Sequence, residues 1–185
     1  MTILDKKNHE RNKFKDLREK SSLLDRMNVE INVKLFIESF LIKGVKNKHI
    51  GIYWPLKNEV DLRSLNDIYS LALPRCKKNK ELLFCKWNEK QLTKDSKGIP
   101  SPCSSLELDY KDLSMILIPC LAVDKNLIRL GYGGGYFDRL RGDENWRAIP
   151  CFGVLTSNCV SRKFLTKADW DIPLSGYITE KEIFV

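Results

Sequence analysis

The stretch from Arg129 to Arg139 constrains the fold most strongly, because it holds four of the ten glycines of this 185-residue chain. An apolar run before it, residues 115–119, is typical of a buried strand. Residues 136–141 can begin a helix. A strand, a glycine turn and a helix start expose several backbone N–H groups toward one point. That arrangement suits an anion, most often a phosphate.

The same turn also has a purely structural interpretation. Glycine allows a positive φ and a close approach of the backbone, so a tight strand-to-helix turn can need glycines only to avoid clashes. Arg129 at the start of the stretch can form a fork with phosphate oxygens, which favours the binding interpretation. The turn alone does not separate the two interpretations.

Strand and helix patterns alternate along the rest of the chain. Residues 1–45 predict helices, with a break or N-cap at Asn28 and a C-cap at Gly44. The other expected elements are strands at 49–54, 71–75, 82–87, 115–119, 150–155 and 176–179, a helix at 61–69 and a surface loop at 93–106. The alternation predicts a single α/β domain, in which a mainly parallel central sheet is flanked by helices. It would consist of a helical lead-in (1–45) and an α/β core (46–185). In such sheets ligands bind beyond the carboxyl ends of the strands, where the glycine turn falls.

Several classes of chemistry are disfavoured by the composition. The only histidines are His9 and His49, which argues against a Ser-His-Asp or Cys-His machinery and against a His-rich metal site. The chain lacks the G-x-x-x-x-G-K-[ST] pattern of a standard P-loop. Its six cysteines are spread out without a C-x-x-C pair, so we expect reduced, buried thiols.

The formal net charge of +8 leaves three interpretations open: nucleic-acid binding, a polyanionic substrate, or a lysine-rich background composition. No RNP-type motif or clear helix-turn-helix pattern accompanies the charge, so no nucleic-acid partner is expected. No apolar segment is long enough for a signal peptide or a membrane span. We therefore expect a cytoplasmic protein that does not associate with membranes.

Three carboxylates are candidate site residues. Asp138 lies in the first turn of the expected helix, where it can complement the helix dipole. If a phosphate binds at the same place, the two anions repel unless a divalent cation lies between them, which predicts Mg²⁺. Asp171 is a candidate second ligand or an ordinary turn residue. Glu59, just after Tyr53 and Trp54, can accept from the N–H groups of a flat heterocycle such as a pterin, or be a solvated residue beside a core aromatic pair.

The segment Pro119–Asp124 followed by Arg129–Arg139 resembles the signature of the 5-formyltetrahydrofolate cyclo-ligases (5,10-methenyltetrahydrofolate synthetases). The resemblance spans nearly the whole chain. Five further features agree in order: Leu17-Arg18, Tyr53-Trp54-Pro55 with Glu59-Val60, Leu73-Pro74-Arg75, Gly98–Pro102, and Trp170–Leu174 with Ile178–Glu180. Phe14 stands where the family often has a lysine, so Lys13 or Lys15 would replace it.

The resemblance implies ATP- and Mg²⁺-dependent conversion of 5-formyltetrahydrofolate to 5,10-methenyltetrahydrofolate, with release of ADP and phosphate. The formyl oxygen would attack the γ-phosphate, and N10 would then close the ring. The implied ATP contacts are Lys13, Lys15, Arg18, Arg75, Arg129, Leu130, Gly131, Tyr132, Gly133, Gly134, Gly135, Tyr136 and Phe137, with Arg129 and Tyr136 catalytic. The implied folate contacts are Trp54, Glu59, Tyr132, Gly133, Gly134, Gly135 and Tyr136. Asp138 and Asp171 would bind Mg²⁺.

The alternative is a non-catalytic nucleotide- or RNA-binding relative on the same scaffold. Asp138, Arg129 and Glu59 together argue against it, because a simple binding protein needs no metal ligand. The expected partners are therefore a reduced folate and ATP, and the expected state is a monomer.

Overall fold

The computed structural model describes residues 1–41, 48–88, 91–102 and 106–185. Over this part of the chain the largest sheet has eight strands in the order β13-β12-β10-β7-β1-β2-β3-β6. They are β1 (His49–Gly51), β2 (Leu71–Cys76), β3 (Leu82–Lys86), β6 (Glu107–Leu108), β7 (Leu113–Pro119), β10 (Cys151–Val154), β12 (Gly176–Ile178) and β13 (Ile183–Phe184). The five strands β12, β10, β7, β1 and β2 are parallel. The antiparallel strands are β13 at one edge, and β3 followed by β6 at the other. The predicted α/β class with a mainly parallel sheet is confirmed.

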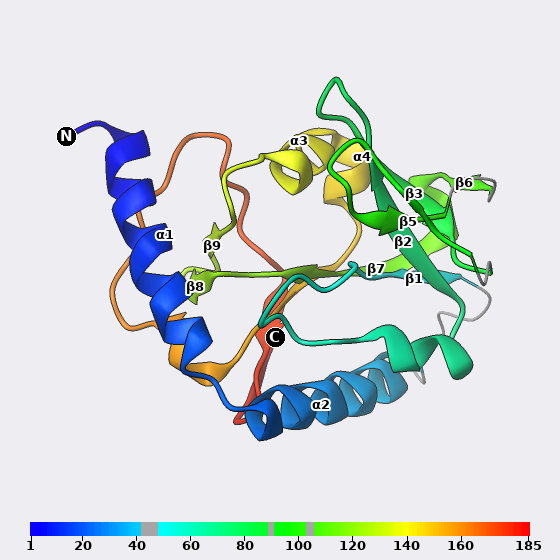
Figure 1. Cartoon of the computed structure of the whole chain (residues 1–185), viewed down its shortest axis with the longest axis horizontal. Helices are drawn as coiled ribbons and strands as arrows, with labels where there is room; N and C mark the ends of the chain where they lie inside the picture. Colours follow the sequence, from blue (N-terminus) through cyan, green and yellow to red (C-terminus); the bar gives the residue numbers. More distant parts are fainter. Residues whose placement is uncertain (42–47, 89–90, 103–105) are drawn as a thin grey trace.

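Helices cover both faces of this sheet (Figure 1). One face packs on α2 (Leu23–Leu41), and the other on α3 (Tyr136–Gly142) and α4 (Glu144–Arg147). The predicted helix at 61–69 is a 3₁₀ helix, η1 (Arg63–Asp67), and the predicted loop at 93–106 contains a hairpin of β4 (Thr93–Lys94) and β5 (Pro100–Ser101). No helix among the described residues is long and apolar enough to cross a membrane.

The helix break predicted at Asn28 is wrong, because α2 runs through that residue. The first helix, α1, ends at Glu19, and α2 begins after Ser22. Ser22 and Asp25 cap α2 reciprocally: the Asp25 amide donates to Ser22 Oγ at 3.0 Å, and the Ser22 amide donates to Asp25 Oδ2 at 3.0 Å. This capping box fixes the helix start upstream of Asn28. The C-cap predicted at Gly44 lies outside the described residues.

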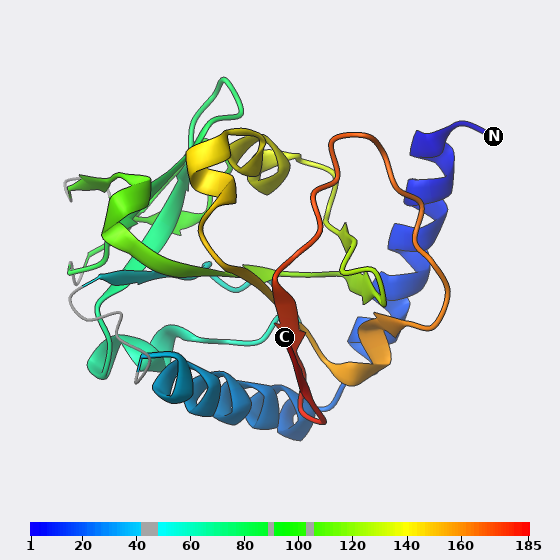
Figure 2. The same cartoon turned by 180° about the vertical axis from the view of Figure 1, so that it is seen from behind.

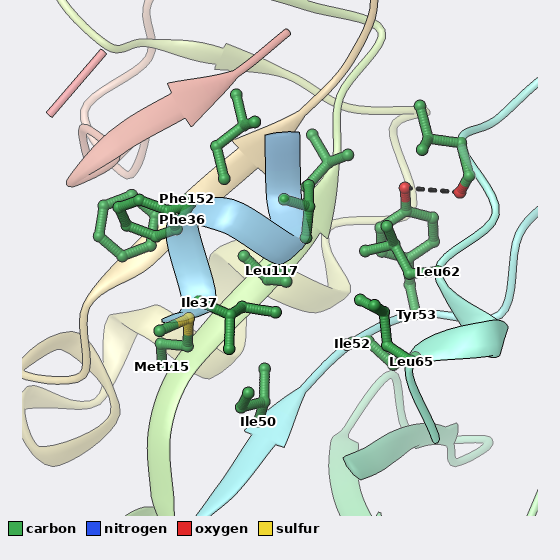
Figure 3. Packing of buried hydrophobic residues seen from close by; sticks show 14 of the residues in the cluster. Phe36, Ile37, Ile50, Ile52, Tyr53, Leu62, Leu65, Met115, Leu117 and Phe152 are labelled. Atoms are coloured by element: carbon green, nitrogen blue, oxygen red, sulfur yellow. Dashed lines mark hydrogen bonds between the residues drawn. The ribbon is translucent and has the colours of Figure 1, made fainter. Parts of the chain in front are cut away.

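Strand β7 is buried on both faces, which explains its continuous apolar sequence. Met115 and Leu117 pack in the cluster that includes Ile37 of α2 and Phe152 of β10 (Figure 3). Ile116 belongs to the opposite cluster, against the α3 side. Two separate hydrophobic clusters, one on each face of the sheet, therefore hold β7 in position.

A smaller unit carries the chain from β7 into the glycine turn. It is a sheet of β8 (Ala122–Asp124), β9 (Arg129–Leu130) and β11 (Val160–Ser161), which the sequence did not predict. Helix α1 (Ile3–Glu19) packs on it through Phe14, which is buried together with Ile128 and Leu130 (Figure 2).

The buried carboxylate of Asp124 closes the turn between β8 and β9. Its Oδ1 accepts from the amides of Asn126 at 2.9 Å and Ile128 at 3.0 Å, and its Oδ2 accepts from the amide of Leu165 at 2.8 Å. The start of the glycine turn thus depends on three charge-assisted hydrogen bonds.

Asp124→Ala should lower the free energy of unfolding by about 3 kcal/mol, because three amides lose their acceptor in a buried place. Urea unfolding followed by tryptophan fluorescence measures this change. Asp169→Ala, at an exposed position, is the matched control and should change the stability little. Equal effects of the two substitutions would contradict this role of Asp124.

Candidate active site

A cavity of about 400 Å³ opens at the carboxyl ends of β1, β2 and β7. Its wall includes residues that follow β1 (Tyr53, Trp54), the end of β2 (Pro74, Cys76), the end of β7 (Pro119) and the whole glycine turn. This is the position that an open α/β sheet offers a ligand. The strands therefore bring together segments that lie far apart in the sequence.

The glycine turn adopts backbone conformations that other residues rarely tolerate. Gly133 has φ +96°, and Gly135, which precedes the first residue of α3, has φ +68°. A Cβ at Gly133 would also lie 3.2 Å from Arg11 Cζ. Over the described part of the chain, the amides of Gly133, Gly134 and Gly135 donate to no protein acceptor. They are available to an anion in the cavity.

Besides Lys97, three cationic side chains line the same cavity. Arg11 Nε donates to the Gly131 carbonyl at 2.9 Å, so α1 contacts the glycine turn directly. Lys7, one helical turn earlier, forms a buried ion pair with Asp171. Arg129 Nη2 donates to Asp138 Oδ1 at 2.9 Å, and its Nη1 donates to the Pro119 carbonyl at 3.2 Å. These contacts fix the positions of the three cationic side chains near the free amides of the glycine turn.

Glu59 is a buried carboxylate, and it lines the cavity together with Trp54. Its Oε2 accepts from the Leu56 amide at 2.8 Å, and its Oε1 lies 3.4 Å from Arg18 Nη1. Burial raises the pKa of the Glu59 carboxyl, and the Leu56 amide and Arg18 oppose that rise only in part. The Arg18 guanidinium also lies 5.0 Å from the centroid of the Tyr132 ring. Burial, together with the nearby Glu59 carboxylate, raises the pKa of Tyr132 to about 12.

Asp138 and Asp171 both line the cavity, and each has a cationic partner. The side chain of Asp138 is about a third exposed, at 34 %. Asp171 is buried, and its Oδ2 also accepts from the Ala168 amide at 2.7 Å. Among the described residues, no three His, Cys, Asp or Glu side chains are grouped to hold a metal ion. A metal here would therefore take most of its ligands from a bound substrate and from water.

The structure brings most of the predicted site residues to this cavity. Those in its wall are Trp54, Glu59, Arg129, Leu130, Gly131, Tyr132, Gly133, Gly134, Gly135, Tyr136, Phe137, Asp138 and Asp171. Arg18 lies behind the wall, in contact with Glu59 and Tyr132.

Three predicted ATP contacts lie elsewhere. Lys13 and Lys15 are exposed, and Lys13 Nζ lies 5.2 Å from the centroid of the Phe14 ring. Arg75 forms an ion pair with Glu107 of β6. None of these three residues lines the cavity.

Sequence reasoning missed Lys7 and Arg11, which do line the cavity. A signal for them exists, because Lys7, Arg11, Phe14 and Arg18 are spaced by four, three and four residues and share one face of α1. Buried Phe14 marks that face as the inner one. Sequence reasoning also missed Asp95 and Lys97 of the β4–β5 hairpin, which line the cavity. No local pattern indicates where that hairpin lies.

Comparison with known proteins gives a consistent result. The sequence model of the 5-formyltetrahydrofolate cyclo-ligase family matches residues 4–151. The 5-formyltetrahydrofolate cyclo-ligase of Haemophilus influenzae is 27% identical over 146 residues, which cover 72% of this chain and 76% of that protein.

Two solved structures are similar along nearly the whole chain. The 5,10-methenyltetrahydrofolate synthetase of Aquifex aeolicus superimposes with a TM-score of 0.77 at 27% identity, covering 96% of this chain and 91% of that one. The synthetase of Mycoplasma pneumoniae gives a TM-score of 0.71 at 22% identity, covering 94% and 98%, and supports the fold alone.

The raised pKa of Glu59 predicts how stability depends on pH. Between the ordinary carboxyl pKa of 4.5 and the raised native value, the folded protein binds more protons than the unfolded chain. Stability therefore falls as pH rises through that window. Glu59→Gln has no proton to lose, so the wild type should lose stability relative to this variant as pH rises above the ordinary carboxyl pKa of 4.5.

Urea unfolding of both proteins across that range measures the difference. Glu19→Gln, at an exposed position of α1, is the control and should follow the wild type. A constant difference between wild type and Glu59→Gln, or one of opposite slope, would contradict the assignment.

Proposed function

The chain belongs to the 5-formyltetrahydrofolate cyclo-ligase family and is a ligase, and we propose that it uses ATP and Mg²⁺ to convert 5-formyltetrahydrofolate into 5,10-methenyltetrahydrofolate. The observation that carries this proposal is the combination of two walls in one cavity. One part of the lining, the glycine turn with Lys7, Arg11 and Arg129, presents open backbone amides and cationic side chains, and another part includes the buried carboxylate of Glu59 and the aromatic Trp54. The first suits a triphosphate and the second a pterin.

The reaction proceeds in two steps. The formyl oxygen attacks the γ-phosphorus of ATP, the bond to the β-phosphate oxygen breaks, and ADP leaves. N10 then attacks the activated formyl carbon and loses its proton, and the C–O bond breaks to release inorganic phosphate. Phosphoryl transfer of this kind depends on positioning and on stabilising charge rather than on a strong base. A site without histidine in its wall can carry it out.

The phosphates occupy the glycine turn. The amides of Gly133, Gly134 and Gly135 donate to phosphate oxygens, and Arg129 and Arg11 add charge from either side. Arg129 is held by its bond to Asp138, so its guanidinium can face the transferring phosphate without reorganising. Lys7 is a further contact from α1, in place of the more distant Lys13 and Lys15.

The pterin occupies the opposite wall. Glu59 accepts from pterin N–H groups, and Trp54 contacts the ring. Glu59 already holds two donors, the Leu56 amide and Arg18, which keep its carboxylate oriented toward the cavity. Tyr132 lies between the two walls, because it contacts Arg18 and belongs to the glycine turn. Tyr136 follows the turn and contacts the reacting groups.

Asp138 and Asp171 would hold Mg²⁺. Their number fits that ion, which binds proteins through one or two carboxylates and keeps its other positions for phosphate and water. The ion, when bound, supplies neutralisation of the phosphate charge. The ion pairs with Arg129 and Lys7 hold both carboxylates in place before the metal ion arrives. A cytoplasmic location and a monomeric state remain predictions.

Incubation of the protein with 5-formyltetrahydrofolate, ATP and Mg²⁺ should produce the near-ultraviolet absorbance of the methenyl product. Formation should require ATP and should stop when EDTA is added in excess of Mg²⁺. No ATP-dependent product at high protein concentration would refute the activity. If RNA bound with a steep salt dependence instead, a binding role would replace it.

Arg11→Met should raise KM for ATP about tenfold, because it removes a forked charged contact at the phosphates. Lys6→Met is the matched control, since Lys6 is exposed on the same helix. Lys13→Met tests the expectation from the sequence motif. A larger rise in KM for Lys13→Met than for Arg11→Met would place ATP differently from this proposal.

A further inference from the structure

The two carboxylates proposed for Mg²⁺ lie on separate segments of the chain. Asp138 is in the first turn of α3, and Asp171 is in the loop between β11 and β12. Both line the cavity. Mg²⁺ requires a near-ideal octahedral arrangement of its ligands. A contact that fixes these two segments relative to each other therefore also controls how well they hold a metal ion.

Arg141 joins the two segments. It lies in the last turn of α3, three residues after Asp138, and only 6 % of it is exposed. Its Nη1 donates to the Ile172 carbonyl at 2.9 Å, and its Nη2 donates to the Pro173 carbonyl at 2.7 Å. These two carbonyls belong to the residues directly after Asp171. The helix that carries Asp138 thus holds the backbone next to Asp171 through the rigid fork of one guanidinium.

The loop that carries Asp171 lies between α1 and α3 (Figure 1). Its residues Asp169 and Trp170 are exposed. From α1, Lys7 forms the ion pair with Asp171, and from α3, Arg141 holds the two carbonyls that follow. Lys7 lines the cavity, whereas Arg141 does not. Loss of the Arg141 side chain would therefore shift Asp171 without removing a group from the cavity wall.

Stability alone does not explain a guanidinium at this position. Among the described residues, no carboxylate forms an ion pair with Arg141, and its buried Nε has no hydrogen-bond partner. Burial of a charge without a counterion costs free energy. Both carbonyl bonds of Arg141 are directed at one short stretch of the loop. A need to keep that stretch at a fixed distance from α3 explains this arrangement.

We propose that Arg141 is a positioning residue for the metal site: it sets the separation of Asp138 and Asp171 and thereby strengthens the binding of Mg²⁺ together with the nucleotide. The inference rests on the proposed function, because it takes these two carboxylates as the Mg²⁺ ligands. The alternative is that Arg141 only ties the loop to the rest of the fold. In that case its loss would weaken nucleotide binding equally with and without Mg²⁺.

The test measures how much Mg²⁺ strengthens the binding of a non-hydrolysable ATP analogue. Calorimetry gives Kd for the analogue in EDTA and in excess Mg²⁺, and the ratio of the first to the second reports the contribution of the metal without turnover. In Arg141→Met this ratio should fall about tenfold, as is usual when a group that orients a metal ligand is removed. Kd in EDTA should stay unchanged. Arg141→Lys keeps the charge but not the fork, so it should recover part of the ratio.

A double variant shows whether Arg141 acts through Asp171. Asp171→Asn should itself lower the ratio, since it removes a proposed ligand. Arg141→Met added to Asp171→Asn should lower the ratio no further, because both changes affect the same interaction and are not additive. A further fall as large as that of Arg141→Met alone overturns the proposal.

Arg147→Met is the matched control. Exposed Arg147 also donates to carbonyls, those of Arg141 and Gly142, but these lie within α3 and not in the loop. This variant should keep the wild-type ratio. An unchanged ratio in Arg141→Met, or an equal rise of both Kd values, overturns the positioning role while leaving the activity established.

The remaining outcomes are also decisive. If circular dichroism shows that Arg141→Met does not fold, Arg141→Lys is judged by the same criteria. A lowered ratio in Arg141→Met, with no ATP-dependent methenyl product from the wild type, overturns the proposed function and supports the role of Arg141 at the metal. A wild-type ratio of one overturns the metal site and the role of Arg141 together.

Discussion

The site depends on the burial of β7 against a helix layer on each face. A strand packed on one face only could tilt, but Met115 and Leu117 are held on the α2 side and Ile116 on the α3 side. The end of β7 at Pro119 is therefore fixed in space. The Pro119 carbonyl in turn accepts from Arg129, which begins the glycine turn. Rigid positioning of this kind is what phosphoryl transfer requires of a protein.

The features that were predictable from sequence are those with a local cause. The apolar run of β7 and the glycine turn can each be recognised from a few neighbouring residues, and both were predicted correctly. The start of α2 also has a local cause, the Ser22–Asp25 capping box. Asn28 is also of a residue type that is favoured at helix N-caps, which explains why a helix break was wrongly predicted there.

The parts that could not be predicted depend on how distant segments pack. Whether Lys7 or Lys13 reaches the cavity is decided by the face of α1 that Phe14 buries against β9, and the family motif does not contain that information. Arg75 was expected at the phosphates, but the structure pairs it with Glu107 of β6, a strand of two residues with no recognisable pattern. Asp95 and Lys97 reach the cavity only because a hairpin folds back onto β2.

Three ion pairs surround the cavity: Lys7–Asp171, Arg18–Glu59 and Arg129–Asp138. The first two pairs are buried, and buried pairs are weak evidence for stability, because desolvation offsets most of their attraction. Their arrangement is better explained by function.

A site for a triphosphate needs several cations close together, and without substrate these would repel one another. A carboxylate beside each cation removes that repulsion and fixes the side chain. In the function we propose, the same carboxylates would serve the groups that accompany the phosphate: a metal ion at Asp138 and Asp171, and pterin N–H groups at Glu59.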